Sequence, residues 1–176
     1  KIDTQVPTVS GIVISSATGL RNSFLNEGDN VSVTATFSEN VLVTGTPRLT
    51  LVVGSNNRTA PYASGDNSTA VVFTNTIQAG DNDTDGISIG ANILALNGGT
   101  IRDPAGNIAT LTHDAVSDNA SYKVDTTAPT VNPFTLSDSE LKAGDNATVT
   151  LVFSEAIVAF SRANNITVDN GTLTTM

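Results

Sequence analysis

The clearest pattern along the chain is a strict alternation of apolar and polar residues from position 31 to position 37. Apolar residues occupy every second position, and Ser or Thr occupies the positions between them, in the order VSVTATF. A period of two places one face of an extended segment on a core and the other face in water. This stretch therefore predicts a half-buried β-strand.

Six other stretches have the composition and length of strands and are bounded by clusters of Gly, Asn, Asp or Ser. They are Val9–Ile14, Leu49–Val53, Arg58–Tyr62, Val71–Ile77, Ile87–Ile89 with a possible extension toward Leu96, and Ser121–Val124. Helical periodicity with caps is missing, and only residues 91–96 and 114–117 could hold a helical turn. About seven short strands with regularly spaced turns predict an all-β fold, an antiparallel β-sandwich.

The sequence also repeats itself. Residues 123–131, KVDTTAPTV, repeat the first nine residues, KIDTQVPTV, at a distance of 122 residues. A second correspondence, at a distance of 116 residues, relates residues 141–155 to residues 25–39, and both stretches end in Phe-Ser-Glu. The repeat predicts a first domain at residues 1–122, a connector at 123–131, and the amino-terminal part of a second domain at 132–176.

The predicted second domain has sequence for only about its first three strands. Half of a sandwich leaves an apolar face open and is unstable alone. We therefore expect an incomplete second β-sandwich repeat, and we expect the chain to be a piece of a longer protein. The alternative is that another chain completes the half by strand exchange.

The net charge of the chain limits the kinds of molecule that it is expected to bind. Asp and Glu number 17 against 8 Lys and Arg, which gives a net charge of -9. Nucleic acids and anionic membranes require a basic face, so neither is an expected partner, and cations are favoured instead. No apolar run approaches the length of a membrane span, so we expect no membrane insertion.

Catalytic chemistry finds little support in the sequence. There is no Cys, the only histidine is His113, and no Gly-x-Ser-x-Gly motif is present. No nucleophile can be paired with a base from residue spacing. We therefore expect the protein not to be an enzyme. The lack of Cys also excludes disulfides and thiolate metal sites.

One loop resembles the first half of an EF-hand calcium loop. Asp81, Asp83 and Asp85 occupy positions 1, 3 and 5, and Gly86 occupies position 6. Calcium binds six to eight oxygen ligands, and alternate carboxylates converge when the backbone curls tightly. The twelfth position is Asn92, so any remaining ligands must come from elsewhere. The alternative interpretation is an acidic turn in solvent.

Strand counting suggests where the other ligands lie. If strands alternate up and down, the loop at 81–85 lies at the end of the domain where the last strand leaves, beside Asp125. By the same counting, Glu155 approaches Asp125 from the second domain, and Glu39 approaches Asp3 in the first. Our hypothesis is that these carboxylates bind calcium at the junction between consecutive domains.

The turn Asp103-Pro104-Ala105-Gly106-Asn107 has two interpretations. It can be a second calcium loop, in which Asp103 is a ligand. It can also be a plain turn with Pro at the second position and Gly at the fourth, and this is the favoured of the two.

Four motifs together resemble the bacterial Ig-like tandem repeats of large surface adhesins, including RTX-type biofilm adhesins. The motifs are the connector at 123–131, Phe-Ser-Glu at 37–39 and 153–155, the run Ala79–Asp83, and the turn Asp103–Asn107. The resemblance implies an extender region at the bacterial cell surface. In such a region, calcium-rigidified domains hold a ligand-binding tip away from the cell, and neighbouring repeats of the same chain are the partners. The Cys pair and core Trp of true immunoglobulin domains are missing, so "Ig-like" here concerns strand arrangement only.

Two classes of function remain. The first is a structural spacer for cell adhesion or biofilm formation, and the second is a module that binds carbohydrate or another ligand. Sugar sites usually offer exposed aromatic side chains, and the chain has no Trp, two Tyr and six Phe. The scarcity of aromatic residues favours the spacer, and a glycan ligand remains the alternative.

Overall fold

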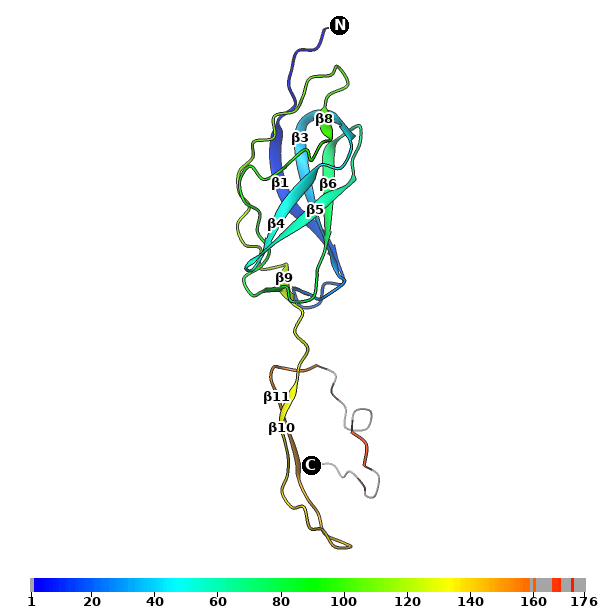
Figure 1. The fold of residues 1–176 in the computed structure, drawn as a ribbon, viewed down its shortest axis with the longest axis vertical. Helices are drawn as coiled ribbons and strands as arrows, with labels where there is room; N and C mark the ends of the chain where they lie inside the picture. Colours follow the sequence, from blue (N-terminus) through cyan, green and yellow to red (C-terminus); the bar gives the residue numbers. More distant parts are fainter. Residues whose placement is uncertain (1, 159, 161–165, 169–171, 173–176) are drawn as a thin grey trace. The chain divides into compact units, whose positions relative to one another are not determined.

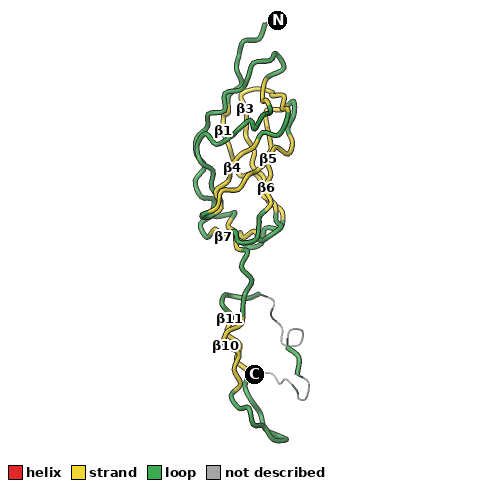
Figure 2. Tube along the Cα trace, in the orientation of Figure 1, coloured by secondary structure: helices red, strands yellow, loops and turns green. Residues whose placement is uncertain are grey.

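The computed structural model describes residues 2–158, 160, 166–168 and 172 (Figure 1). The chain divides into two compact units, Lys1–Thr127 and Ala128–Met176, and each is described by itself. Figure 2 shows strands joined by loops, and residues 91–96 and 114–117 form no helical turn. In the part of the chain that the structure describes, no helix has the length and apolar character to cross a membrane.

The first unit is built on one strongly curled antiparallel sheet with strand order β1-β3-β6-β5-β4. A further short strand, β8, pairs with the far end of β3. The bounds are Val9–Thr18 for β1, Asn30–Thr44 for β3, Arg48–Val53 for β4, Asn56–Ser64 for β5, Ser68–Thr76 for β6 and Thr100–Arg102 for β8. The prediction of an all-β, Ig-like antiparallel fold is confirmed.

A second, small sheet closes the end of the first unit opposite the amino terminus (Figure 1). Its order is β2-β9-β7, with β2 at Phe24–Leu25, β9 at Lys123–Asp125 and β7 at Asn82–Asp83. The β2–β9 pair is parallel, whereas β7 and β9 are antiparallel. Because Asn82 pairs with Asp125, the loop after β6 lies beside the start of the connector.

Alternate residues of the sheet strands make the core. Val31, Val33 and Ala35 are fully buried, and Phe37 is 2% exposed, as the period of two between positions 31 and 37 predicts. The largest fully buried side chain is Phe73 on β6. The long segment between β7 and β9 covers the open side of the curled sheet and contributes buried apolar side chains, including Ile87, Ile89 and Ile101.

Several predicted strands differ from the structure in their bounds, including the first, which continues beyond Ile14 to Thr18. The strand predicted at Ile87–Ile89 does not form, because this segment meets its neighbours only at single bridges, Val52 with Ser88 and Ile89 with Val116. Burial of alternate apolar residues was therefore not enough to make a continuous ladder. The second predicted strand continues beyond Phe37 to Thr44, since its last residues pair with β8.

The second unit repeats the beginning of the first. Its strands β10 (Val131–Leu136) and β11 (Val149–Phe153) are antiparallel. Every pair between them has a counterpart between β1 and β3, at the distances of 122 and 116 residues seen in the sequence. The counterparts are Val131↔Phe153 and Val9↔Phe37, Phe134↔Leu151 and Ile12↔Ala35, Thr135↔Thr150 and Val13↔Thr34, and Leu136↔Val149 and Ile14↔Val33. The two units therefore begin the same fold in the same register.

The two units differ in how these strands are covered. Ile12 and Ile14 on β1 are 7% and 8% exposed, whereas their counterparts Phe134 and Leu136 on β10 are 62% and 50% exposed. In the first unit β6 pairs with β3, but among the described residues of the second unit β11 pairs with β10 alone. Within its described residues, the second unit thus contains the counterparts of β1 and β3 alone.

Candidate metal centre

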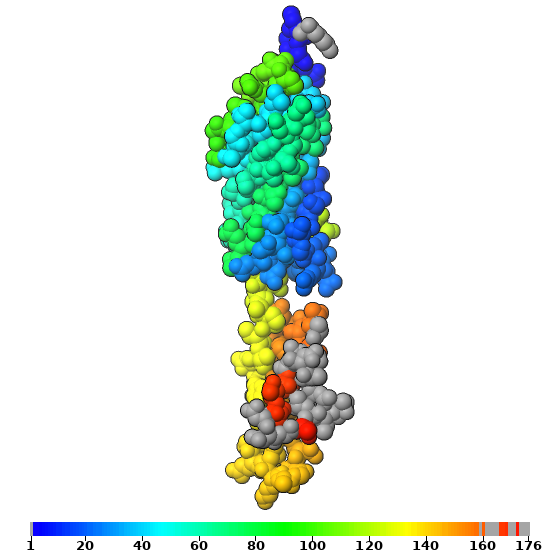
Figure 3. Space-filling model, turned by 90° about the vertical axis from the view of Figure 1, so that its right-hand side faces the viewer, coloured from blue at the N-terminus to red at the C-terminus, as the bar shows by residue number. Residues whose placement is uncertain are grey.

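Three carboxylates meet at the amino-terminal end of the first unit. Asp3, Glu39 and Asp103 each offer an oxygen within 4.8 Å of the others. They come from the segment before β1, from an irregular part of β3, and from the turn after β8. In Figure 3 the blue amino-terminal segment lies at the same end of this unit as the green segment around residues 100–107. Within the described residues no other group of three acidic or His side chains is this close.

Asp103 is held rigidly by its own turn. Its Oδ1 accepts hydrogen bonds from the backbone N–H groups of Gly106 at 2.6 Å and Asn107 at 2.8 Å, and its Oδ2 accepts one from Asn107 Nδ2 at 2.7 Å. Burial raises the pKa of Asp103, but the donors of Asn107 and of the turn backbone outweigh burial and lower the pKa below its ordinary value. The buried Asp103 is therefore a stable, oriented anion.

Glu39 differs from Asp103 because one of its carboxylate oxygens has no hydrogen-bond donor among the described residues. Its Oε1 is closed off from solvent and has no hydrogen-bond partner among the described residues. Burial, followed by the charges of Asp3 and Asp103, raises the pKa of Glu39. A carboxylate oxygen that is buried without a donor costs free energy unless a proton or a cation neutralises it. Either a proton or a cation could therefore neutralise the charge of this cluster.

We expect Glu39 to make the protein in EDTA less stable as the pH rises. Its folded-state pKa lies above the ordinary value of 4.5, so between these two values the folded chain holds more protons than the unfolded chain. The contribution of Glu39 is complete below pH 4.5 and is lost as the pH rises through the folded-state pKa. Urea unfolding in EDTA across this range, compared between the wild type and Glu39→Gln, measures it. A difference between the two proteins that does not change with pH would contradict this expectation.

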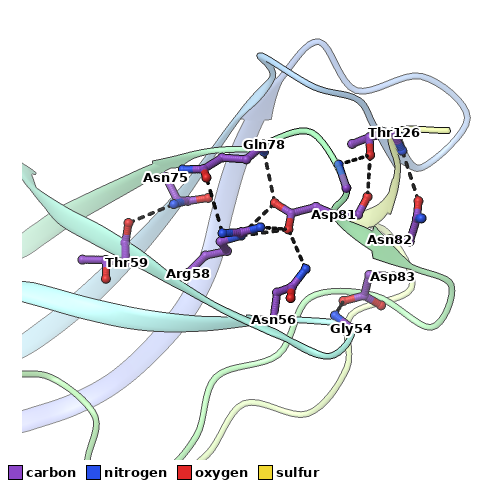
Figure 4. A network of polar contacts seen from close by, with 11 residues as sticks. Gly54, Asn56, Arg58, Thr59, Asn75, Gln78, Asp81, Asn82, Asp83 and Thr126 are labelled. Atoms are coloured by element: carbon purple, nitrogen blue, oxygen red, sulfur yellow. Dashed lines mark hydrogen bonds and ion pairs between the residues drawn. The ribbon is translucent and has the colours of Figure 1, made fainter. Parts of the chain in front are cut away.

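At the opposite end of the unit, Asp81 is fully buried and its carboxylate is saturated by protein donors (Figure 4). Arg58 contacts Oδ1 through Nη2 at 2.6 Å and through Nε at 2.8 Å. Asn56 Nδ2 donates to Oδ1 at 3.0 Å, and the backbone N–H of Gln78 donates to Oδ2 at 3.0 Å. Burial raises the pKa of Asp81, but the donors and the charge of Arg58 lower it overall.

Asp83 also has partners within the protein. Its Oδ1 accepts from the N–H of Gly86 at 2.7 Å, and its Oδ2 accepts from the N–H of Gly54 at 2.8 Å. Asp85 is exposed to solvent. The structure therefore places Asp81, Asp83 and Asp85 in three different environments, and they do not form a close group of ligands.

Sequence reasoning missed the role of Arg58. Three Asp residues in one loop favour a nearby cation, and the chain has 8 Lys and Arg, but no local signal singles out Arg58. What spacing could not show is that Arg58 and Asp81, 23 residues apart, point toward each other.

Asp125 in the first unit and Glu155 in the second unit each lie at a hydrogen bond that is also found at their counterparts, Asp3 and Glu39. Asp125 Oδ1 accepts from the N–H of Thr127 at 2.9 Å, as Asp3 Oδ1 accepts from the N–H of Gln5 at 3.1 Å. Glu155 is partly buried and directly follows Ser154, whose N–H donates to the carbonyl of Thr130 at 2.9 Å. The same bond joins the counterparts Ser38 and Thr8 at 2.9 Å.

Part of the chain is similar to a known family of domains. Residues 125–176 match the family model of a bacterial Ig-like domain. The second unit is similar to bacterial Ig-like domains. The searches of curated proteins and of solved structures found no match. Because the first unit has the same β1–β3 register, the Ig-like assignment extends to it as a fold. Domains of this family are typically not catalytic and are often extracellular.

Proposed function

We propose that the chain is an extender segment of a bacterial cell-surface adhesin, in which tandem Ig-like domains are stiffened by calcium at their junctions. The observation that carries the proposal is the cluster of Asp3, Glu39 and Asp103 at the end of the domain where the chain enters. Such a segment serves adhesion or biofilm formation mechanically, outside the cell, and performs no catalysis.

Calcium fits this donor set better than transition metals do. The three side chains offer hard carboxylate oxygens, which suit calcium, whereas zinc and copper favour imidazole or thiolate. The Nε2 of His113 accepts the N–H of Ile93 at 3.0 Å, so this imidazole is occupied. Carboxylates that are already ordered, such as Asp103, lower the entropic cost of binding an ion.

The repeat extends the proposal to the next junction. Asp125 and Glu155 are the counterparts of Asp3 and Glu39 at the distances of 122 and 116 residues. We propose that each of them is a calcium ligand, as its counterpart is. Asp81 and Asp83 are assigned to the protein's own hydrogen bonds, and exposed Asp85 stays a candidate ligand at the exit of the first domain.

Calcium should stabilise the first unit measurably. Extracellular calcium modules bind with dissociation constants of about 10⁻⁴–10⁻³ M. At an ion concentration 100 times the dissociation constant, linkage stabilises the folded state by about 2.7 kcal/mol. Thermal unfolding with calcium, and with EDTA, tests this effect on the wild type and on Glu39→Gln.

Glu39→Gln should lose most of the shift in Tm on addition of calcium, because the variant keeps the size of the side chain and removes a charged ligand. Asp118→Asn is the matched control, since Asp118 is exposed and lies outside the cluster. An equal calcium shift in the wild type and in Glu39→Gln would overturn the proposed site.

The spacer function has a separate test. Small-angle scattering of the chain with and without calcium should show a longer and stiffer particle when the ion is present. A glycan screen of the same protein tests the alternative function, and specific binding there with no calcium response in scattering would favour a ligand-binding module.

A further inference from the structure

The first residues of the connector are hydrogen-bonded to the segment that follows β6. We call residues 78–83 the exit loop. Thr126 Oγ1 accepts the N–H of Gly80 at 3.0 Å and donates to the carbonyl of Asp81 at 3.0 Å (Figure 4). One hydroxyl therefore satisfies two backbone groups of the exit loop.

Asn82 makes the complementary contacts. Its Oδ1 accepts the N–H of Thr126 at 3.2 Å, and its Nδ2 donates to Thr127 Oγ1 at 3.3 Å. The residue also pairs with Asp125 in the antiparallel β7–β9 ladder. Asn82 thus contacts three consecutive residues of the connector, although its side chain is exposed and contributes nothing to the core.

The exit loop is itself anchored to the β4–β5 hairpin. The Arg58–Asp81 ion pair fixes its middle, and the N–H of Gly54 donates to Asp83 at its end. Gly54 has a φ of 56°, and a Cβ at this position would collide with the carbonyl oxygen of Asn82. Because only a residue without a Cβ permits this close approach, Gly54 allows the hairpin and the exit loop to pack directly against each other.

The other side of β9 is equally fixed. Leu25 of β2 pairs with Val124, and these side chains are 0% and 1% exposed. The connector therefore starts from a strand with an ordered neighbour on each side, and all of these contacts are made by protein atoms.

We propose that the exit loop is a latch that fixes the direction in which the connector leaves the first domain without any bound ion, and that Asn82 and Thr126 are its positioning residues. The latch also holds Asp125 in a set orientation, and this part rests on the proposed function, in which Asp125 is a calcium ligand. Hydrogen bonds would then set the direction of the exit, and calcium would act on the entrance of the following domain.

The chain has no Cys, so two spin labels can be placed without removing native residues. Ser55→Cys on the β4–β5 turn and Ala128→Cys in the connector are both at exposed positions. In EDTA, the distance distribution between the labels should be narrow, and it should broaden in Asn82→Ala and in Thr126→Val. Exchange of the Thr126 amide hydrogen should accelerate by roughly five-fold or more in Asn82→Ala, as expected for loss of one hydrogen bond.

Asn57→Ala and Thr84→Val are matched controls, because both side chains are exposed and make no hydrogen bond to described residues. Tyrosine fluorescence verifies that each variant is folded. The latch is overturned if Asn82→Ala and Thr126→Val leave both measurements as in the wild type. It is also overturned if the wild-type distribution is broad in EDTA and narrows only with calcium. Failure of the calcium proposal is distinct, since it appears as a Tm that does not respond to the ion while the narrow distribution persists.

Discussion

Replacing Arg58 with Met should lower the free energy of unfolding of the first unit by about 3–5 kcal/mol, the cost of removing one partner of a buried ion pair. Asp81 is 0% exposed and Arg58 is 24% exposed, so the carboxylate would be left buried without its cation. Loss of the guanidinium also removes the Nε and Nη2 groups that donate hydrogen bonds to Asp81.

Urea unfolding followed by tyrosine fluorescence measures the effect, because both Tyr residues, Tyr62 and Tyr122, lie in the first unit. The double variant Arg58→Met/Asp81→Leu is the control. Replacing a buried ion pair by apolar residues is often nearly neutral, so the double variant should recover most of the stability. A single variant as stable as the wild type would show that the pair is not buried in solution.

The dependence of stability on acidic pH is an independent test of the Arg58–Asp81 ion pair. The pKa of Asp81 in the folded chain lies below its ordinary value of 3.8. Its contribution to stability is therefore complete above pH 3.8 and is lost as the pH falls through the folded-state pKa. In Arg58→Met this acid-side loss should become smaller or change sign, because the largest group that favours the ionised carboxylate is gone.

Replacing Phe73 with Ala should cost about 3–5 kcal/mol, the range for large aromatic residues deleted from a core. Phe73 is the largest fully buried side chain and lies on β6, between β3 and β5 in the sheet. Its ring meets that of Tyr62 edge to face, with centroids 6.5 Å apart. The substitution therefore removes buried apolar area, an aromatic contact and the packing between neighbouring strands.

Phe134→Ala in the second unit is the matched control. Phe134 is 62% exposed, and surface substitutions usually change stability by less than about 0.5 kcal/mol. The tyrosine signal of the first unit should unfold at the wild-type urea concentration in this variant. A loss in Phe73→Ala no larger than in Phe134→Ala would contradict the core described for the first unit.

The acidic residues at the two ends of the first domain have different surroundings. Asp81 and Asp83 bond to protein donors and stabilise the end from which the connector leaves. Asp3, Glu39 and Asp103 gather at the end where the chain enters, and Glu39 Oε1 is buried there with no donor among the described residues. This is where a cation would compensate their charge. Their difference is one of partners and not of residue type.

A large part of the fold follows from local pattern. The period of two at 31–37 predicts the central strand, and the distances of 122 and 116 residues predict that the second unit starts in the register of the first. The strand near Ile87 was wrong because periodicity reports burial, whereas a ladder also requires a neighbour with free backbone groups along its length.

The sequence by itself determined which residues alternate, where the repeat starts and that Glu39 would approach Asp3, because strand parity and repeat distance are properties of the chain. Only the tertiary structure decided that Asp103 lies beside Asp3 and Glu39, and that Arg58 forms an ion pair with Asp81. Both contacts join segments far apart in sequence, 64 residues in the first case and 23 in the second. The curl of the sheet sets such distances, and no local pattern encodes it. Sequence alone does not distinguish one Asp in a turn from another. The hydrogen-bond donors that surround the carboxylate decide whether it bonds to groups of the protein or is free to bind an ion.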